Sequence, residues 1–324
     1  MLVAAAVLTA CAAVGPNYER PAGAVANSQV ANGPFLGAGN AAFDPEPVPG
    51  DWWRLYESAT LDGLVQEALV ANTDLRAAAG NIERALAGLD YADAAKNPTT
   101  TLLATTTYGR RSAEEELRPG KPLSNNFVYG LGAGVSYQVD LFGQIARTIE
   151  SANADTGAAR AAYDTTRVTV VAETTRAFLD VCSFGREIAV AERSVALQEK
   201  STELTRTLFR TGRGSTLDVT RASAQTDQVR ATLPVLNAQK RVALYRLAVL
   251  TGHAPEDFPR AVQSCDQEPH LARPIPVGDG AGLLRRRPDI RRSEYELHSA
   301  TARIGVATAD LYPKITLGAS IGSV

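Results

Sequence analysis

The chain has 324 residues, of which 45% are hydrophobic, 21% charged and only 6% aromatic. This balance excludes a disordered polar chain, and the formal net charge of −2 excludes nucleic-acid binding through bulk positive charge. No stretch reaches the roughly 18 consecutive apolar residues of a spanning helix, which rules out a polytopic helical membrane protein. A membrane protein of the strand type is compatible with these numbers, because its spanning segments are weakly hydrophobic on average.

Residues 1–10 are predicted to be a lipoprotein signal peptide. They are nearly all apolar and small, and they lead directly into Cys11. The run is too short to span a membrane but suits the apolar region of a signal peptide. Leu8-Thr9-Ala10-Cys11 has the form of a lipobox, where bacteria attach acyl chains such as palmitate to the cysteine and cleave before it. No Lys or Arg precedes the run, so we expect the true start to lie upstream. The alternative is a buried apolar strand with an incidental cysteine.

Residues 11–60 are rich in Pro, Gly, Ala and Asn and show no period, which predicts an extended, lipid-anchored arm. Trp52 and Trp53 are expected to fix its end against an apolar surface. A helix is predicted over 61–96 from apolar residues at a spacing of 3.6, and it begins a helix-strand-strand-helix repeat over 61–282.

Two strands are predicted over 99–111 and 127–140, joined by a long polar loop. The second alternates strictly and is about 40 Å long at roughly 3.3 Å per residue, enough to cross a bilayer when tilted. We expect the apolar set to face lipid and the small polar set to face a lumen; the alternative is half of a soluble sandwich. The lipid-facing set is Phe127, Tyr129, Leu131, Val135 and Tyr137, and the lumen-facing set is Gly130, Gly132, Gly134, Ser136 and Gln138.

Long helices are predicted over about 145–211 and 216–250, with Pro234 as a possible point of division in the second. The first would be about 100 Å long, which predicts a coiled coil or an array of parallel helices rather than a globular core. Export would permit a disulfide between Cys182 and Cys265, but we expect Cys182 to pack as a small apolar residue.

The end of the chain repeats an earlier part. A shift of 215 positions overlays Asp74-Leu75-Arg76 on Asp289-Ile290-Arg291, and Pro98 on Pro313. Residues 283–324 therefore read as the start of a second repeat, and we expect the chain to be truncated relative to a two-repeat protein.

No catalytic constellation is found, so no enzyme, metal site or cofactor is predicted. His253, His270 and His298 lie in unrelated contexts and are expected to be loop or surface residues. There is no phosphate-binding loop and no nucleophile elbow.

Several motifs along the chain carry a family resemblance. They are Val14-Gly15-Pro16-Asn17-Tyr18-Glu19-Arg20-Pro21, Trp52-Trp53, Asp140-Leu141-Phe142-Gly143, Arg287-Pro288-Asp289-Ile290-Arg291, Ala302-Arg303-Ile304-Gly305-Val306-Ala307 and Tyr312-Pro313. With the lipobox and the long helix, they make the chain resemble the outer-membrane factor family, the TolC/NodT-type outer-membrane lipoproteins of RND-type tripartite efflux systems.

The resemblance implies an α+β membrane protein: a trimeric outer-membrane β-barrel continued by a periplasmic α-helical coiled-coil barrel, with the second of two internal repeats incomplete. It implies a passive duct for drugs, toxic compounds or metals, as in multidrug resistance. The implied partners are outer-membrane lipid, two further copies in a homotrimer, a periplasmic adaptor (membrane fusion protein) and an inner-membrane pump, with no nucleic acid. The adaptor-docking tip would comprise Thr211, Gly212, Arg213, Gly214, Ser215, Leu217 and Asp218.

The alternative from another class is a lipid-anchored periplasmic adaptor or scaffold that uses the long hairpin as a spacer. The sequence does not identify the exported substrate, because a lining of Gly, Ser, Gln and Thr carries no evident selectivity.

Overall fold

A computed structural model describes residues 13–35, 37–112, 119–120, 124–258, 260–271 and 273–323. The predicted signal peptide and Cys11 lie outside these residues. The chain divides into two compact units. The sheet unit holds residues 13–20, 82–159 and 292–323, and the helical unit holds Pro21–Asn81 and Arg160–Arg291. None of the helices in the described part of the chain has the length and apolarity needed to cross a membrane.

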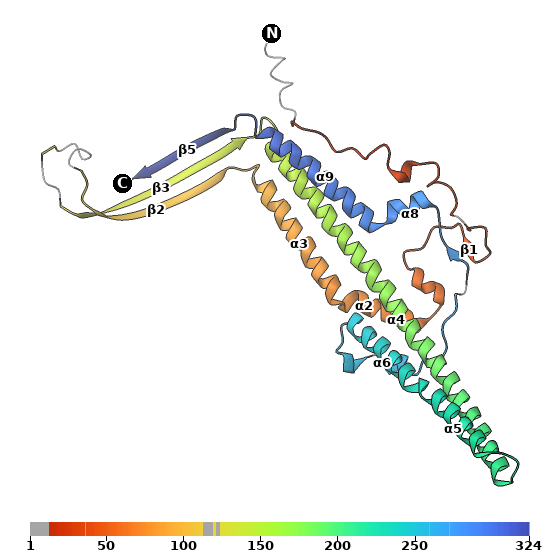
Figure 1. Cartoon of the computed structure of the whole chain (residues 1–324). Helices are drawn as coiled ribbons and strands as arrows, with labels where there is room; N and C mark the ends of the chain where they lie inside the picture. The colour runs from red at the N-terminus through yellow and green to blue at the C-terminus, as the bar shows by residue number, and fades with distance from the viewer. Residues whose placement is uncertain are drawn as a thin grey trace. The chain divides into compact units, whose positions relative to one another are not determined.

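The sheet unit contains a three-stranded antiparallel sheet in the order β2-β3-β5 (Figure 1). Its strands are β2 (Thr99–Gly109), β3 (Asn126–Val139) and β5 (Ile315–Ser323). The first two lie within two residues of the strand limits that the alternation predicts. Thr and β-branched residues suit a pleated surface, and the glycines of β3 let neighbouring strands approach closely. The sheet leaves one edge of β2 and one edge of β5 unpaired within the described residues.

Three helices meet the sheet: α3 (Thr73–Ala94), α4 (Gln144–Arg210) and α9 (Pro288–Ala309). Asp140 starts α4, because its two carboxylate oxygens accept the amide hydrogens of Ile145 and Ala146 at 3.1 and 2.8 Å. Such bonds satisfy donors that have no partner in the first turn of a helix. Both α3 and α9 have 22 residues, and their limits are 215 positions apart, the offset found in the sequence.

The helical unit holds the second part of α4 together with the remaining helices: α2 (Ala59–Ala71), α5 (Thr216–Arg230), α6 (Thr232–Leu250), α7 (Arg260–Gln263) and α8 (Gly280–Arg286). Short turns η1 (Val25–Asn27), η2 (Trp52–Tyr56) and η3 (Pro255–Asp257) and the strand pair β1 (Phe43–Asp44) and β4 (Ile275–Pro276) complete it. Its core includes Trp53, Leu61, Phe178, Val181 and Leu247. Trp53 lies in this core, as predicted for the end of the arm, and its indole N–H donates to Asp62 at 3.0 Å.

The prediction of one helix over 61–96 is wrong, because Asn72 divides it into α2 and α3. Asn72 has an extended backbone, and its side-chain oxygen accepts the amide hydrogens of Asp74 and Leu75 at 2.9 and 3.2 Å. Its side-chain nitrogen also donates to the carbonyl of Leu250 at 3.1 Å. Asn72 therefore ends one helix and caps the next.

The segment 216–250 is likewise two helices, which meet at Ala231. The division falls three residues before Pro234, the residue whose missing N–H and ring disturb the preceding helical turn.

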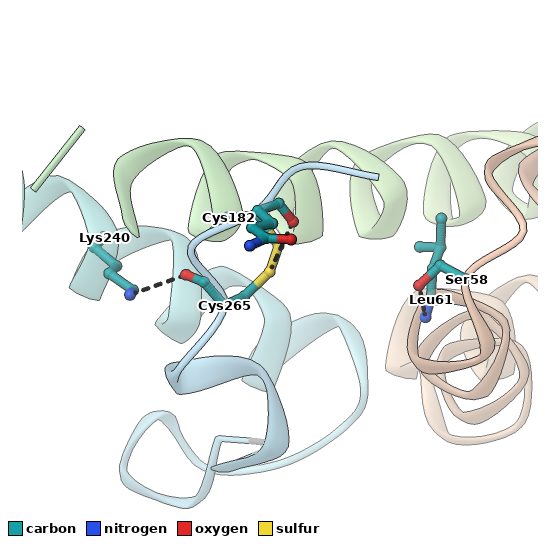
Figure 2. The surroundings of a disulfide bond; sticks show 6 residues. Ser58, Leu61, Cys182, Lys240 and Cys265 are labelled. Atoms are coloured by element: carbon teal, nitrogen blue, oxygen red, sulfur yellow. Dashed lines mark hydrogen bonds between the residues drawn. A yellow bond between two sulfur atoms is a disulfide. The ribbon is translucent and has the colours of Figure 1, made fainter. Parts of the chain in front are cut away.

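The expectation for the cysteines is also wrong, because Cys182 and Cys265 form a disulfide (Figure 2). Their Cα atoms are 4.7 Å apart. Although Cys182 is embedded in α4, the connection after α6 brings Cys265 close above it. Gly185, one turn along α4, allows this approach because a Cβ atom there would collide with the carbonyl oxygen of Cys265.

Candidate functional site

One face of the β2-β3-β5 sheet is apolar and exposed. Directly opposite residues share a face, so this face combines the odd-numbered apolar positions of β3 with the residues of β2 and β5 that lie opposite them. Thr100, Thr106 and Ser323 are polar members of it. Leu102 and Ile321 both lie opposite Ala133, and Leu317 lies opposite Tyr137. All five predicted lipid-facing residues lie on this face and are exposed, Leu131 to 68%. No other part of the described residues therefore covers this face of the sheet.

The other face carries small and polar side chains. All five predicted lumen-facing residues lie there, and Gly132 stands opposite Gly322, while Ser136 stands opposite Gly318. Two apolar residues also lie on this face: Leu103, which is exposed and opposite Gly132, and Val128, opposite Thr107. No charged side chain occurs on either face of the three strands.

The N-terminal arm is attached where the sheet passes into the helices. Val14 donates its amide hydrogen to the carbonyl of Phe142 at 3.1 Å, and the Phe142 ring stacks on Tyr312 with centroids 4.5 Å apart. Gly143 has a φ of +76°, and a side chain there would collide with Ala13. The first described residues of the arm thus lie beside the turn that follows β3.

Arg147, on the first turn of α4, binds this arm through its guanidinium group. It is only 5% exposed, and its guanidinium donates to the carbonyls of Val14 and Gly15 and to Asn17 Oδ1 at 3.2, 3.3 and 2.8 Å. A fourth bond, at 2.7 Å, reaches Glu150. Burial alone would raise the pKa of Glu150, but hydrogen bonds from Arg147 and His298 outweigh burial and lower it. The arm is therefore held by charge-assisted hydrogen bonds in a largely buried place.

His298 and Tyr18 extend the same attachment. Their rings stack with centroids 4.6 Å apart, and His298 Nε2 lies 2.9 Å from a carboxylate oxygen of Glu150. The Tyr18 hydroxyl donates to Glu294 at 3.2 Å, and Arg20 reaches the same carboxylate at 2.7 Å. Burial and the charge of Glu294 raise the pKa of Tyr18. His298 is thus a partly exposed residue, and it contributes to the attachment of the arm, a role that the sequence does not predict.

The predicted tip residues form an exposed turn between α4 and α5. Gly212 has a φ of +75°, which suits a glycine after a helix, and Arg213 donates its amide hydrogen back to the carbonyl of Leu208 at 2.8 Å. Ser215 and Asp218 form a reciprocal capping box that starts α5. The hydrogen bonds from Ser215 lower the pKa of Asp218. The turn is thus rigidly built although all seven predicted residues are exposed.

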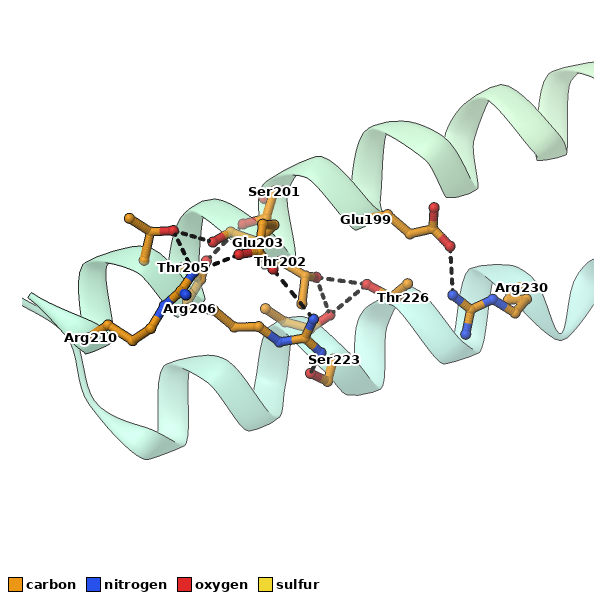
Figure 3. A network of polar contacts seen from close by, with 12 residues as sticks. Glu199, Ser201, Thr202, Glu203, Thr205, Arg206, Arg210, Ser223, Thr226 and Arg230 are labelled. Atoms are coloured by element: carbon orange, nitrogen blue, oxygen red, sulfur yellow. Dashed lines mark hydrogen bonds and ion pairs between the residues drawn. The ribbon is translucent and has the colours of Figure 1, made fainter.

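Behind the turn, α4 and α5 are joined by a polar network (Figure 3). The hydroxyls of Thr202 and Thr226 are 2.7 Å apart and buried, and Arg230 pairs with Glu199 at 2.6 Å. Leu208 and Phe209, at the end of α4, are 40% and 44% exposed, and Leu217, at the start of α5, is 56% exposed. In the sequence, Leu208 belongs to the helical apolar pattern of α4, and nothing there distinguishes Phe209 as a residue beside the turn.

The comparison with known proteins assigns a family to this architecture. Residues 64–253 match the family described as "Outer membrane efflux protein", which is more than half of the chain. The chain belongs to the outer membrane efflux protein family.

Two curated relatives resemble this chain over nearly all of its length. Nodulation protein T of Rhizobium leguminosarum bv. trifolii is 29% identical over 97% of this chain and 65% of its own length. Outer membrane protein OprJ of Pseudomonas aeruginosa is 31% identical over 99% of this chain and 65% of its own length. The chain thus spans less than two thirds of the length of either relative.

A solved structure agrees with the fold. The outer-membrane channel OprN matches with a TM-score of 0.82 and 32% identity over 94% of this chain and 66% of its own. This structural relative is an outer-membrane channel. Within the described part of the chain, no group of three or more His, Cys, Asp or Glu side chains could hold a metal ion.

Proposed function

We propose that the chain is the outer-membrane channel component of a tripartite efflux system, a passive duct for small molecules that an inner-membrane pump drives. The observation that carries this proposal is the two-faced sheet. Its exposed apolar face suits lipid, and its face of Gly, Ser, Thr and Gln suits a water-filled lumen. Membership of the outer membrane efflux protein family supports the same assignment.

The proposal requires more than one copy of the chain. A sheet with unpaired edge strands is unstable in lipid, because the unpaired backbone N–H and C=O groups at its edges cost free energy there. In a homotrimer, strands from each copy would close a common barrel, and the long α4 helices would line a coiled-coil tunnel that continues it. Lipid would lie against Phe127, Tyr129, Leu131, Val135 and Tyr137, and the lumen against Gly130, Gly132, Gly134, Ser136 and Gln138.

The attachment of the arm supports a lipid anchor at Cys11. Ala13 lies beside Gly143, at the end of the sheet where β3 has just ended. Cys11 is two positions earlier in the sequence. Acyl chains on Cys11 would therefore begin at the level where the strands leave the membrane, as expected for an outer-membrane protein whose helices extend into the periplasm.

The turn between α4 and α5 is the proposed docking site for a periplasmic adaptor. Thr211, Gly212, Arg213, Gly214 and Ser215 present backbone and polar groups, and Leu217 adds an exposed apolar side chain beside Asp218. The capping box keeps this surface in one conformation, which lowers the entropic cost of binding.

The equal lengths and constant offset of α3 and α9 support two internal repeats, with residues 61–282 as the first and 283–324 as the start of the second. The scaffold alternative is not favoured, because a soluble scaffold would not expose an uncharged apolar sheet face of this size.

Heat-modifiable gel mobility of the protein extracted from outer membranes tests the proposal. A folded trimeric barrel resists detergent when unheated and shifts on boiling, whereas a scaffold gives one mobility. Release of a stable, soluble species by Cys11→Ser would favour the scaffold and contradict the channel.

A further inference from the structure

Three contacts fix Cys265 in the connection that follows α6. Its sulfur is bonded to Cys182 of α4, and its carbonyl accepts a hydrogen bond from Lys240 Nζ of α6 at 3.2 Å (Figure 2). The same carbonyl lies over Gly185, where any side chain would collide with it. Two of these contacts do not involve sulfur. The two cysteines would therefore stay close together in the dithiol form.

The two cysteines differ in their exposure to solvent. Cys182 is fully buried in the core with Val181 and Val262. Cys265 is only partly buried, at the edge of that core, and the residues on either side of it are exposed. Thiol–disulfide exchange requires direct approach of one sulfur to another, so an incoming partner can reach Cys265 but not Cys182.

We propose that Cys265 is the exchange site at which a thiol–disulfide oxidoreductase forms and breaks this disulfide, and that Cys182 acts only as the buried resolving thiol. During formation, the Cys265 thiolate attacks the disulfide of the oxidised partner, and one partner cysteine leaves as a thiolate. The Cys182 thiolate then attacks Cys265 Sγ and releases the second partner cysteine. Two electrons pass to the partner, and the two protons of the chain's thiols end on its cysteines.

The disulfide links the two sides of the helical hairpin that α4 forms with α5 and α6. The cysteines are 83 positions apart, and the segment between them contains the end of α4, the tip, α5 and α6. The bond therefore ties the α4 side of the hairpin to the chain that leaves α6.

Glutathione provides the direct test, with the purified chain in detergent and Cys11→Ser in every sample so that the third thiol is absent. The oxidised protein is treated with reduced glutathione, quenched with acid and mapped by mass spectrometry. We expect the mixed disulfide on the peptide that contains Cys265. A mixed disulfide on the Cys182 peptide would overturn the proposal, and this measurement needs no substitution at either cysteine of the pair.

Two single variants give a matched comparison. With oxidised glutathione, Cys182→Ser should form a mixed disulfide at least about tenfold faster than Cys265→Ser, because only the former leaves the accessible thiol. Equal rates, or a faster reaction of Cys265→Ser, would contradict the proposal. An oxidoreductase whose second active-site cysteine is replaced should be trapped on Cys265 alone; failure to trap it there would also overturn the proposal.

Discussion

The guanidinium of Arg147 donates a hydrogen bond to Asn17 Oδ1 at 2.8 Å, across 130 positions of sequence. The bond joins the N-terminal arm to the first turn of the long helix α4. Arg147 is nearly fully buried and also binds the carbonyls of Val14 and Gly15. These bonds fix which residues of the arm lie against the start of α4. The first described residues of the arm are thereby held close to the start of α4 and the end of β3.

Gly15→Ala should detach the arm from α4 and α9. Gly15 has a φ of +89°, and an added Cβ would lie 2.5 Å from the Cα of Gly305. We expect the free energy of detaching the arm from the helices to fall by more than about 1 kcal/mol. Alanine disfavours the positive φ, and its methyl group would collide with Gly305. Limited proteolysis after Arg20 measures this loss. Gly23→Ala is the matched control, since Gly23 has open space around it, and equal cleavage of the two variants would count against the attachment.

Val135→Arg and Gly134→Arg should differ in their effect on membrane assembly. If Val135 faces lipid near the bilayer midplane, its replacement by Arg costs about 2–4 kcal/mol, whereas Arg at position 134 points into a wide aqueous lumen. We expect the first variant to reduce the amount of assembled protein in outer membranes and the second to spare assembly but alter efflux. Equal losses of assembly would argue for a soluble sheet.

The sequence predicts the sheet better than the attachments around it. Strict alternation in β3 identifies both its limits and its two faces, because the period of a strand depends only on local geometry. The arm motif is visible in sequence, but its receptor Arg147 looks like any other arginine on an amphipathic helix. The disulfide is equally hard to predict from the sequence. The approach of Cys265 to α4 depends on Gly185, and a glycine within a helix does not show which segment packs against it.

Gly185→Ala should slow formation of the Cys182–Cys265 disulfide and destabilise the helical unit. The added methyl collides with a backbone carbonyl, which cannot rotate away as a side chain could. We expect a cost of about 1–3 kcal/mol in the free energy of unfolding. Gly80→Ala on α3 is the control. Gly80 has open space around it, so this substitution should stabilise by up to about 1 kcal/mol. Denaturant titration of both variants compares these effects, and a Gly185→Ala protein as stable as the parent would refute the close approach.

Stability should fall slightly as the pH rises through the pKa of His253. His253 Nε2 lies 2.6 Å from Glu67, and this hydrogen bond raises the pKa of the imidazole above its ordinary value. The folded state therefore gains stability that is fully present below pH about 6.5 and is lost as the pH passes the raised pKa. The pair is exposed, so the effect should be within about 0.2–1 kcal/mol. Thermal unfolding from pH 5.5 to 8.5 should show this slope in the parent, and an undiminished slope in Glu67→Gln would assign it to another group.

The most direct test of the channel assignment is the environment of alternate residues along β3. Spin labels are placed singly at positions 130–137 in a Cys11→Ser background and assembled in outer-membrane lipid, where their collisions with oxygen and with a water-soluble nickel chelate are measured. We expect oxygen accessibility to peak at 131, 133, 135 and 137 and chelate accessibility to peak at 130, 132, 134 and 136, in opposite phase. Matching profiles for the two reagents, with no period of two residues, would contradict a strand that separates lipid from an aqueous lumen.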